Sequence, residues 1–188
     1  MKTSTWLSLG LCTLLVLSTA SAVDAQKGKP DLKKVRDEMG IVQSVLDQAL
    51  AQTFGEPFGY LEKAKGVYLP GFGVVFSFEI NLTPSGDIGP FSGRPTVEGM
   101  KAQREEAARR LEKAKTVAQN TLADFGHSLA DLDSKDSVAI VIYTVAVQPS
   151  GLDRNTIVMQ CDKQLIDSYR ANSIDRAAFL RKLTVVVY

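Results

Sequence analysis

The sequence predicts an α+β domain whose mainly antiparallel or mixed sheet has about five strands. Two observations support this prediction. Apolar residues recur at helical spacing in two long segments, 31–54 and 97–125, whereas shorter segments beside them alternate apolar with polar residues or are rich in β-branched residues. The expected order is a helix, two strands, a helix, two strands, two short helices and a final strand. This order indicates the α+β class.

The N-terminal segment has the composition of a secretory signal peptide. Lys2 gives it a positive start, an apolar stretch follows over 6–17, and small residues at 20–22 and 23–25 offer two cleavage sites. The apolar stretch is shorter than the ~20 residues that a membrane span needs. We therefore expect residues 1–25 to be a signal peptide and the protein to be exported, to the periplasm or the extracellular space.

The remaining chain is expected to form a single domain over 31–188, after a short polar lead at 26–30. The whole sequence has 22 basic and 21 acidic residues, so its charge gives no argument for binding nucleic acid or an anionic membrane surface. No transmembrane segment is expected in the mature chain. Cys12 lies in the predicted signal peptide, which leaves Cys161 as the one mature cysteine. No intramolecular disulfide is therefore expected.

Helix-end signals support both long helices. The first, over 31–54, has apolar residues spaced by three, four and five positions, which places them near one face. Asp31 stands at its start, where a carboxylate interacts favourably with the helix dipole, and Gly55 stands at its end. Thr96 and Gly126 have the same places at the two ends of the second helix.

The second helix, over 97–125, is long, charged and central in the chain. Its opposite charges at i,i+4 predict ion pairs of Glu105 with Arg109 and of Glu106 with Arg110. At 1.5 Å per residue the helix would be about 43 Å long. We therefore expect part of it to project beyond the sheet or to break.

Between these helices the sequence predicts a hairpin of two strands, over 66–69 and 74–82. Pro70 and Gly71 fit the central positions of a type II turn, because proline sets φ near −65° and glycine accepts a positive φ. Gly73 suggests a bulge or a close backbone approach. The glycines thus have conformational reasons to be there, and no helix follows them as a phosphate-binding loop would require.

The C-terminal half is expected to supply the other strands and two short helices. The segment 138–147 is almost unbroken in β-branched and apolar residues, which predicts a central strand covered on both faces. A further strand is expected over 156–161, short helices over 163–171 and 174–182, and a final strand over 184–188.

The segment 83–97 contains three prolines and three glycines and is predicted to be a loop. Loops of this length are uncommon in compact domains unless they are functional or disordered. Phe91 and Arg94 are residue types enriched at binding hot spots, so they are the candidate binding residues. The alternative is an ordinary mobile loop with Phe91 packed against the domain.

The candidate catalytic pair is Cys161 with His127. A thiol between a strand and a helix start could have a lowered pKa and act as a nucleophile beside a histidine. The alternation of Ile157, Met159 and Cys161 along one strand instead favours a buried core thiol. Asp162, next in the chain, would also oppose a thiolate.

No metal site and no cofactor are expected. His127 is the only histidine. Asp131, Asp133 and Asp136 lack the glycine and the ligand spacing of a calcium loop. The sequence also has no Gly-x-Ser-x-Gly, His-Glu-x-x-His or phosphate-loop motif.

The sequence therefore predicts an exported, non-catalytic binding domain that contacts another envelope or extracellular protein. The expected contact is the 83–97 loop or an open edge of the sheet, which can accept a partner strand. Two alternatives stay open. One is a secreted hydrolase that uses Cys161 and His127, and the other is a carrier of a small molecule or lipid, which would need a cavity between helices and sheet.

Overall fold

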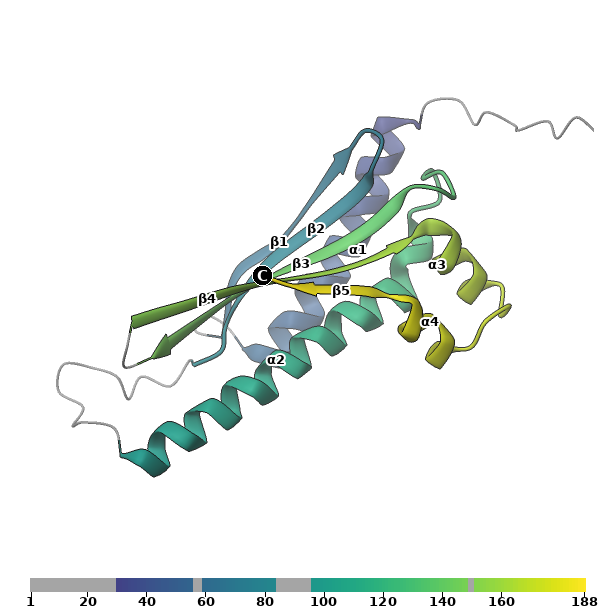
Figure 1. Cartoon of the computed structure of the whole chain (residues 1–188). Helices are drawn as coiled ribbons and strands as arrows, with labels where there is room; N and C mark the ends of the chain where they lie inside the picture. Colours follow the sequence, from purple (N-terminus) through teal and green to yellow (C-terminus); the bar gives the residue numbers. More distant parts are fainter. Residues whose placement is uncertain (1–29, 56–58, 84–95, 149–150) are drawn as a thin grey trace, which may run out of the picture.

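The computed structural model describes most of the chain, namely residues 30–55, 59–83, 96–148 and 151–188. Over these ranges the protein has four α-helices, a 3₁₀ helix and a five-stranded mixed sheet, so the predicted α+β class is confirmed (Figure 1). No helix in this part of the chain is long and apolar enough to span a membrane. The predicted signal peptide 1–25 lies outside the described residues.

The elements follow the predicted order. The helices are α1 (Leu32–Phe54), α2 (Val97–Phe125), α3 (Lys163–Arg170) and α4 (Arg176–Lys182), with the 3₁₀ helix η1 (Gly126–Ser128) directly after α2. The strands are β1 (Tyr60–Leu69), β2 (Gly73–Asn81), β3 (Ser137–Gln148), β4 (Gly151–Asp162) and β5 (Thr184–Val187). They lie in the order β1-β2-β3-β4-β5, and all neighbours are antiparallel except β2 and β3, which are parallel. A parallel pair needs a crossover connection, and α2 provides it.

Local signals set the ends of the long helices, as predicted. The Asp31 side chain accepts a hydrogen bond from the backbone N–H of Lys33 (3.0 Å). Thr96 Oγ1 accepts one from the backbone N–H of Gly99 (3.1 Å). α1 ends at Gly55, whose φ of 69° is one that glycine adopts without the steric cost of a Cβ.

The turn between β1 and β2 is also as predicted. The Phe72 N–H donates to the Leu69 carbonyl oxygen (3.0 Å), and Gly71 between them has a φ of 80°, as a type II turn requires. Gly73 has a φ of 126°, and a Cβ on it would lie 2.1 Å from the carbonyl oxygen of Ser137. The predicted close backbone approach is therefore confirmed, at the first residue pair of β2 and β3.

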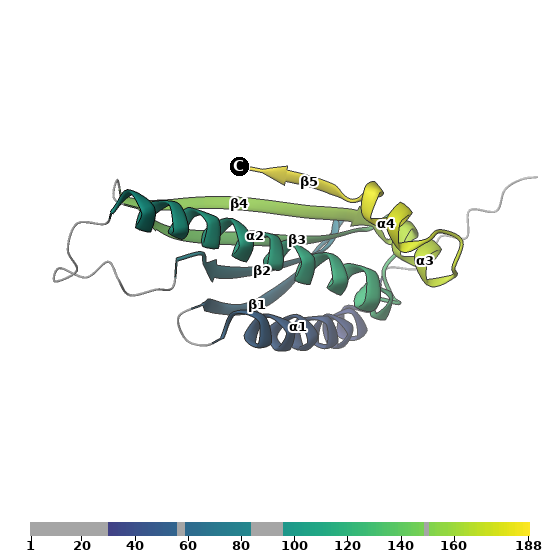
Figure 2. The same cartoon turned by 90° about the horizontal axis from the view of Figure 1, so that it is seen from below.

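Both long helices pack on the same face of the sheet, α1 along β1 and α2 across β3, while α3 and α4 lie together near the C-terminal end of α2 (Figures 1 and 2). The core lies between these helices and the sheet. Its fully buried side chains include Val35, Leu46, Leu50, Phe76, Phe78, Ile80, Ala114, Ala118, Leu122, Ile140, Ile142, Ile157, Met159, Ile166 and Phe179. Alternate residues of each central strand enter this core, as the strand period of two requires.

The ion pairs predicted on α2 differ in the structure. α2 is continuous over its whole length, so it does not break. Glu106 forms its close ion pair with Arg109, whose Nη2 lies 2.7 Å from Glu106 Oε2, and its charge also interacts favourably with Arg110. The Arg110 side chain turns inward instead: its Nε donates to the Asn81 carbonyl oxygen (3.1 Å) and its guanidinium lies 5.0 Å from the centre of the Phe54 ring.

Several predicted boundaries were wrong. β1 begins at Tyr60, well before position 66, and β4 begins at Gly151, well before position 156. α4 begins at Arg176 instead of position 174. The prediction that the central strand is covered on both faces was also wrong, since Tyr143 of β3 is 46% exposed.

Candidate functional site

One face of the sheet carries no helix within the described ranges, because α1 and α2 both lie on the opposite face (Figures 1 and 2). We call it the uncovered face. Strand alternation and register assign to it Lys65 and Val67 of β1, Val75, Ser77 and Glu79 of β2, Ala139, Val141, Tyr143 and Val145 of β3, Arg154, Thr156, Val158 and Gln160 of β4, and Thr184 and Val186 of β5.

The centre of the uncovered face is apolar. Val141 lies opposite Val158, and Val158 lies opposite Val186, so one row of valines crosses three strands. The surface is open to solvent at its margins, where Val67 is 48% and Val186 is 38% exposed. Exposed apolar side chains grouped on one face are a common feature of interaction sites, so this face is the candidate site.

A hollow of about 190 Å³ adds polar groups to the same face. Glu79, Tyr143, Arg154 and Thr156 are among the residues that line it. Pockets for small molecules usually measure about 300–1,000 Å³. This hollow is therefore of a size for a single side chain of a partner, and its acidic, phenolic and guanidinium residues can bind a polar one.

A larger groove of about 650 Å³ lies on the outer side of the helix layer. It runs beside α2 from Thr53 of α1 and is lined by Ala108, Arg109, Glu112, Lys113, Thr116, Val117 and Asn120. The carrier hypothesis requires a cavity between the helices and the sheet, and this groove lies elsewhere.

The structure places Cys161 and His127 as follows. Cys161 is on the helix-covered face of β4, opposite Val138, and is 5% exposed. Burial, with a smaller effect of the Asp162 charge, raises the pKa of the Cys161 thiol to about 12. His127 lies in η1, and its buried Nδ1 has no hydrogen-bond partner in the part of the chain that the structure describes. Among the described residues no hydrogen bond joins the two, and a raised thiol pKa is the opposite of what activates a cysteine nucleophile.

Cys161 is expected to resist thiol reagents in the folded protein and to react once the protein is unfolded in denaturant.

The stability of the protein is also expected to depend on pH through this thiol. Because the folded pKa of about 12 exceeds the ordinary value of 9.0, the unfolded thiol loses its proton first as the pH rises. The stability contributed by this group is therefore complete below about pH 9 and is lost between about pH 9 and about pH 12. The difference in unfolding free energy between wild type and Cys161→Ala, at about pH 7 and about pH 10, measures this. In the labelling experiment, rapid reaction of Cys161 with a thiol reagent in the folded protein would instead support the hydrolase hypothesis.

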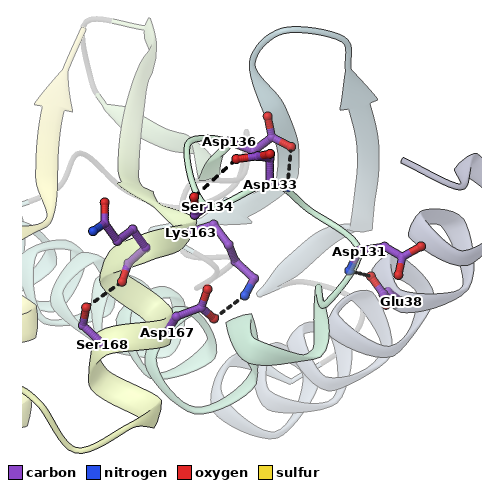
Figure 3. A network of polar contacts seen from close by, with 9 residues as sticks. Glu38, Asp131, Asp133, Ser134, Asp136, Lys163, Asp167 and Ser168 are labelled. Atoms are coloured by element: carbon purple, nitrogen blue, oxygen red, sulfur yellow. Dashed lines mark hydrogen bonds and ion pairs between the residues drawn. The ribbon is translucent and has the colours of Figure 1, made fainter. Parts of the chain in front are cut away.

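The acidic connection before β3 is occupied by internal contacts (Figure 3). The Asp133 N–H donates to Asp136 Oδ2 (3.1 Å), and the Asp131 N–H donates to Glu38 Oε2 (3.1 Å). Within the described ranges no group of three His, Cys, Asp or Glu residues could hold a metal ion.

The two loop candidates, Phe91 and Arg94, lie outside the described residues and stay predictions. The contact predicted from the sequence was the loop or an open sheet edge, and the uncovered face was not proposed. The signal for it is the alternation of Val75, Ser77 and Glu79 with apolar residues, which predicts a strand with only one face buried.

Comparisons of the chain with protein-family models, with curated proteins and with solved structures found no match. The function must therefore be inferred from the chain's own residues.

Proposed function

We propose that the protein is an exported, non-catalytic binding domain that contacts another envelope or extracellular protein through the uncovered face. The observation that supports this is the apolar, solvent-open sheet surface opposite the helices, where Val67 and Tyr143 are each about half exposed. Export is supported by the composition of residues 1–25, a positive start, an apolar stretch and small residues before two cleavage sites.

The chemistry of the uncovered face favours a protein partner. Lys65, Glu79 and Arg154 bring both signs of charge to the same surface as the valines. A surface of mixed sign does not suit a phosphate backbone or an anionic membrane, which call for clustered basic residues. An apolar centre with polar groups around it is instead the usual composition of a protein interface.

Capture of partners with matched variants tests the proposal. The bait is the exported chain, residues 26–188, which follow the predicted signal peptide. The source is the envelope and secreted fractions of the organism that encodes it. The variant Val67→Lys/Tyr143→Lys changes the uncovered face, and the control Leu32→Lys/Val97→Lys makes the same kind of change at exposed apolar residues of α1 and α2. We expect the face variant to lose the specific partner and the control to retain it.

Two other results would count against this proposal. If both variants capture the partner equally well, the uncovered face is not the contact, and a third bait with residues 84–95 replaced by a short linker tests the predicted loop. If none of the baits captures a specific partner, the carrier and the enzyme become the better hypotheses. Where a partner is captured, the affinity of the purified pair, measured by calorimetry, decides whether the captured protein binds directly.

A further inference from the structure

The two edges of the sheet differ in how their backbone groups are used. At the β1 edge, α1 side chains bind the strand: the Ala64 N–H donates to Asp47 Oδ1 (2.6 Å), and Gln43 Nε2 donates to the Ala64 carbonyl oxygen (3.1 Å). At the β5 edge no further strand lies beyond residues 184–187 among the described residues, and both views show β5 as the outermost strand (Figures 1 and 2). β5 is thus the open edge.

Hydrogen bonds to β4 identify which groups of β5 face outward. Tyr188 and Thr156 exchange two backbone hydrogen bonds, of 2.9 and 3.2 Å. In an antiparallel pair such residues alternate with residues whose N–H and C=O point away from the partner strand. The backbone N–H and C=O of Val186 therefore point toward β4. Those of Val185 and Val187 point toward the open side of β5.

We propose that a second copy of this chain pairs with β5, antiparallel, about a two-fold axis normal to the sheet at Val186. In this register Val185 lies opposite Val187 of the second copy, and the two exchange both hydrogen bonds. By symmetry, Val187 and Val185 of the second copy also exchange both hydrogen bonds. Every N–H and C=O of residues 184–187 that points to the open side is then used in both copies. A register centred on Val185 would need the N–H of Leu183, which already donates to the Leu180 carbonyl oxygen (3.3 Å).

The side chains of β5 fit a second copy better than a charged foreign strand. Natural edge strands usually avoid pairing through a charge, a proline, a bulge or a very short length. Residues 184–187, Thr-Val-Val-Val, are short but contain no charge, proline or bulge. Val185 and Val187 are 45% and 62% exposed, and in the proposed register each covers the other across the two-fold axis. The two uncovered faces would then form one continuous surface, although the pairing does not depend on the partner protein proposed above.

Cysteine cross-linking of the purified exported chain tests the register. In the proposed register Val186 lies opposite Val186 of the second copy, in a non-hydrogen-bonded pair. The two Cα atoms are then about 4.5 Å apart, which a disulfide can span. Val185 lies roughly 9 Å from its own copy, which a disulfide cannot span. We expect Val186→Cys to form a disulfide-linked dimer under mild oxidation and Val185→Cys to remain uncross-linked.

Light scattering of the native protein gives the second readout. We expect twice the mass of one chain for wild type and one chain mass for Val187→Pro, because proline removes an outward N–H and leaves the hydrogen bonds to β4 in place. Unchanged circular dichroism will show that this variant is folded. A monomeric wild type overturns the proposal, as does a dimer that cross-links no better at 186 than at 185. Neither result bears on capture through Val67 and Tyr143, which tests the proposed function separately.

Discussion

Gly73→Ala is expected to lower the free energy of unfolding by at least about 3 kcal/mol. Two penalties combine at this residue. A φ of 126° is strained for any residue with a Cβ, and the added Cβ would lie 2.1 Å from the carbonyl oxygen and 2.8 Å from the nitrogen of Ser137. These are backbone atoms of β3, so they can move only if the one parallel pair of the sheet separates at its start. Chemical denaturation measures the loss.

Gly71→Ala is the matched control, two residues away. Its φ is 80°, yet a Cβ there would meet nothing within 4 Å, so it carries only the cost of a left-handed conformation, about 1–2 kcal/mol. Gly40→Ala, in an open position within α1, is expected to raise stability by about 0.5–1 kcal/mol. If Gly73→Ala costs no more than Gly71→Ala, then β2 and β3 do not approach each other this closely in solution.

The helices could be predicted because their signals are local. α2 lies at the predicted positions, since Thr96 caps it through a contact three residues away and its apolar residues repeat along one face. The short C-terminal helices were also predicted, although α4 begins later, because Asp175 and not Ser173 provides the cap that binds the Ala178 N–H (2.6 Å).

Strand ends were harder to predict, because partners distant in sequence decide them. β1 extends back to Tyr60 through two register irregularities that hide the alternation, and contacts from α1 hold that irregular part. β4 extends back to Gly151 because β3 pairs with it along its whole length, which overrides the turn preference of Gly151, Asp153 and Asn155.

The candidate site depends on strand order, which no linear pattern contains. The segment 138–147 is apolar at both alternating sets of positions, and this pattern predicts a strand buried on both faces. What the pattern lacks is the position of α1 and α2, which both pack on one side and leave Val141 and Tyr143 on the other. The same surface could only be assembled once Val158 and Val186 were known to lie beside Val141.

A second large effect is expected at Asp167, which forms an ion pair with Lys163 (Figure 3). Lys163 is the first residue of α3 and only 4% exposed, whereas the Asp167 side chain is 51% exposed. Removing the partner of a buried charge costs about 3–5 kcal/mol. Because water can reach the Asp167 side of the pair, we expect the low end, about 3 kcal/mol, for Asp167→Ala.

Lys163→Met should cost much less than Asp167→Ala, although both break the same ion pair. Methionine fills the space of the lysine stem, and the carboxylate left behind is exposed enough to be hydrated, so we expect a change within about 1 kcal/mol of wild type. The double variant should then recover most of the loss of Asp167→Ala, because no ammonium remains buried, and a double-mutant cycle of unfolding free energies measures this coupling. If both single variants instead stay within about 1 kcal/mol of wild type, the Lys163 ammonium is hydrated in solution and the ion pair does not hold α3 in place.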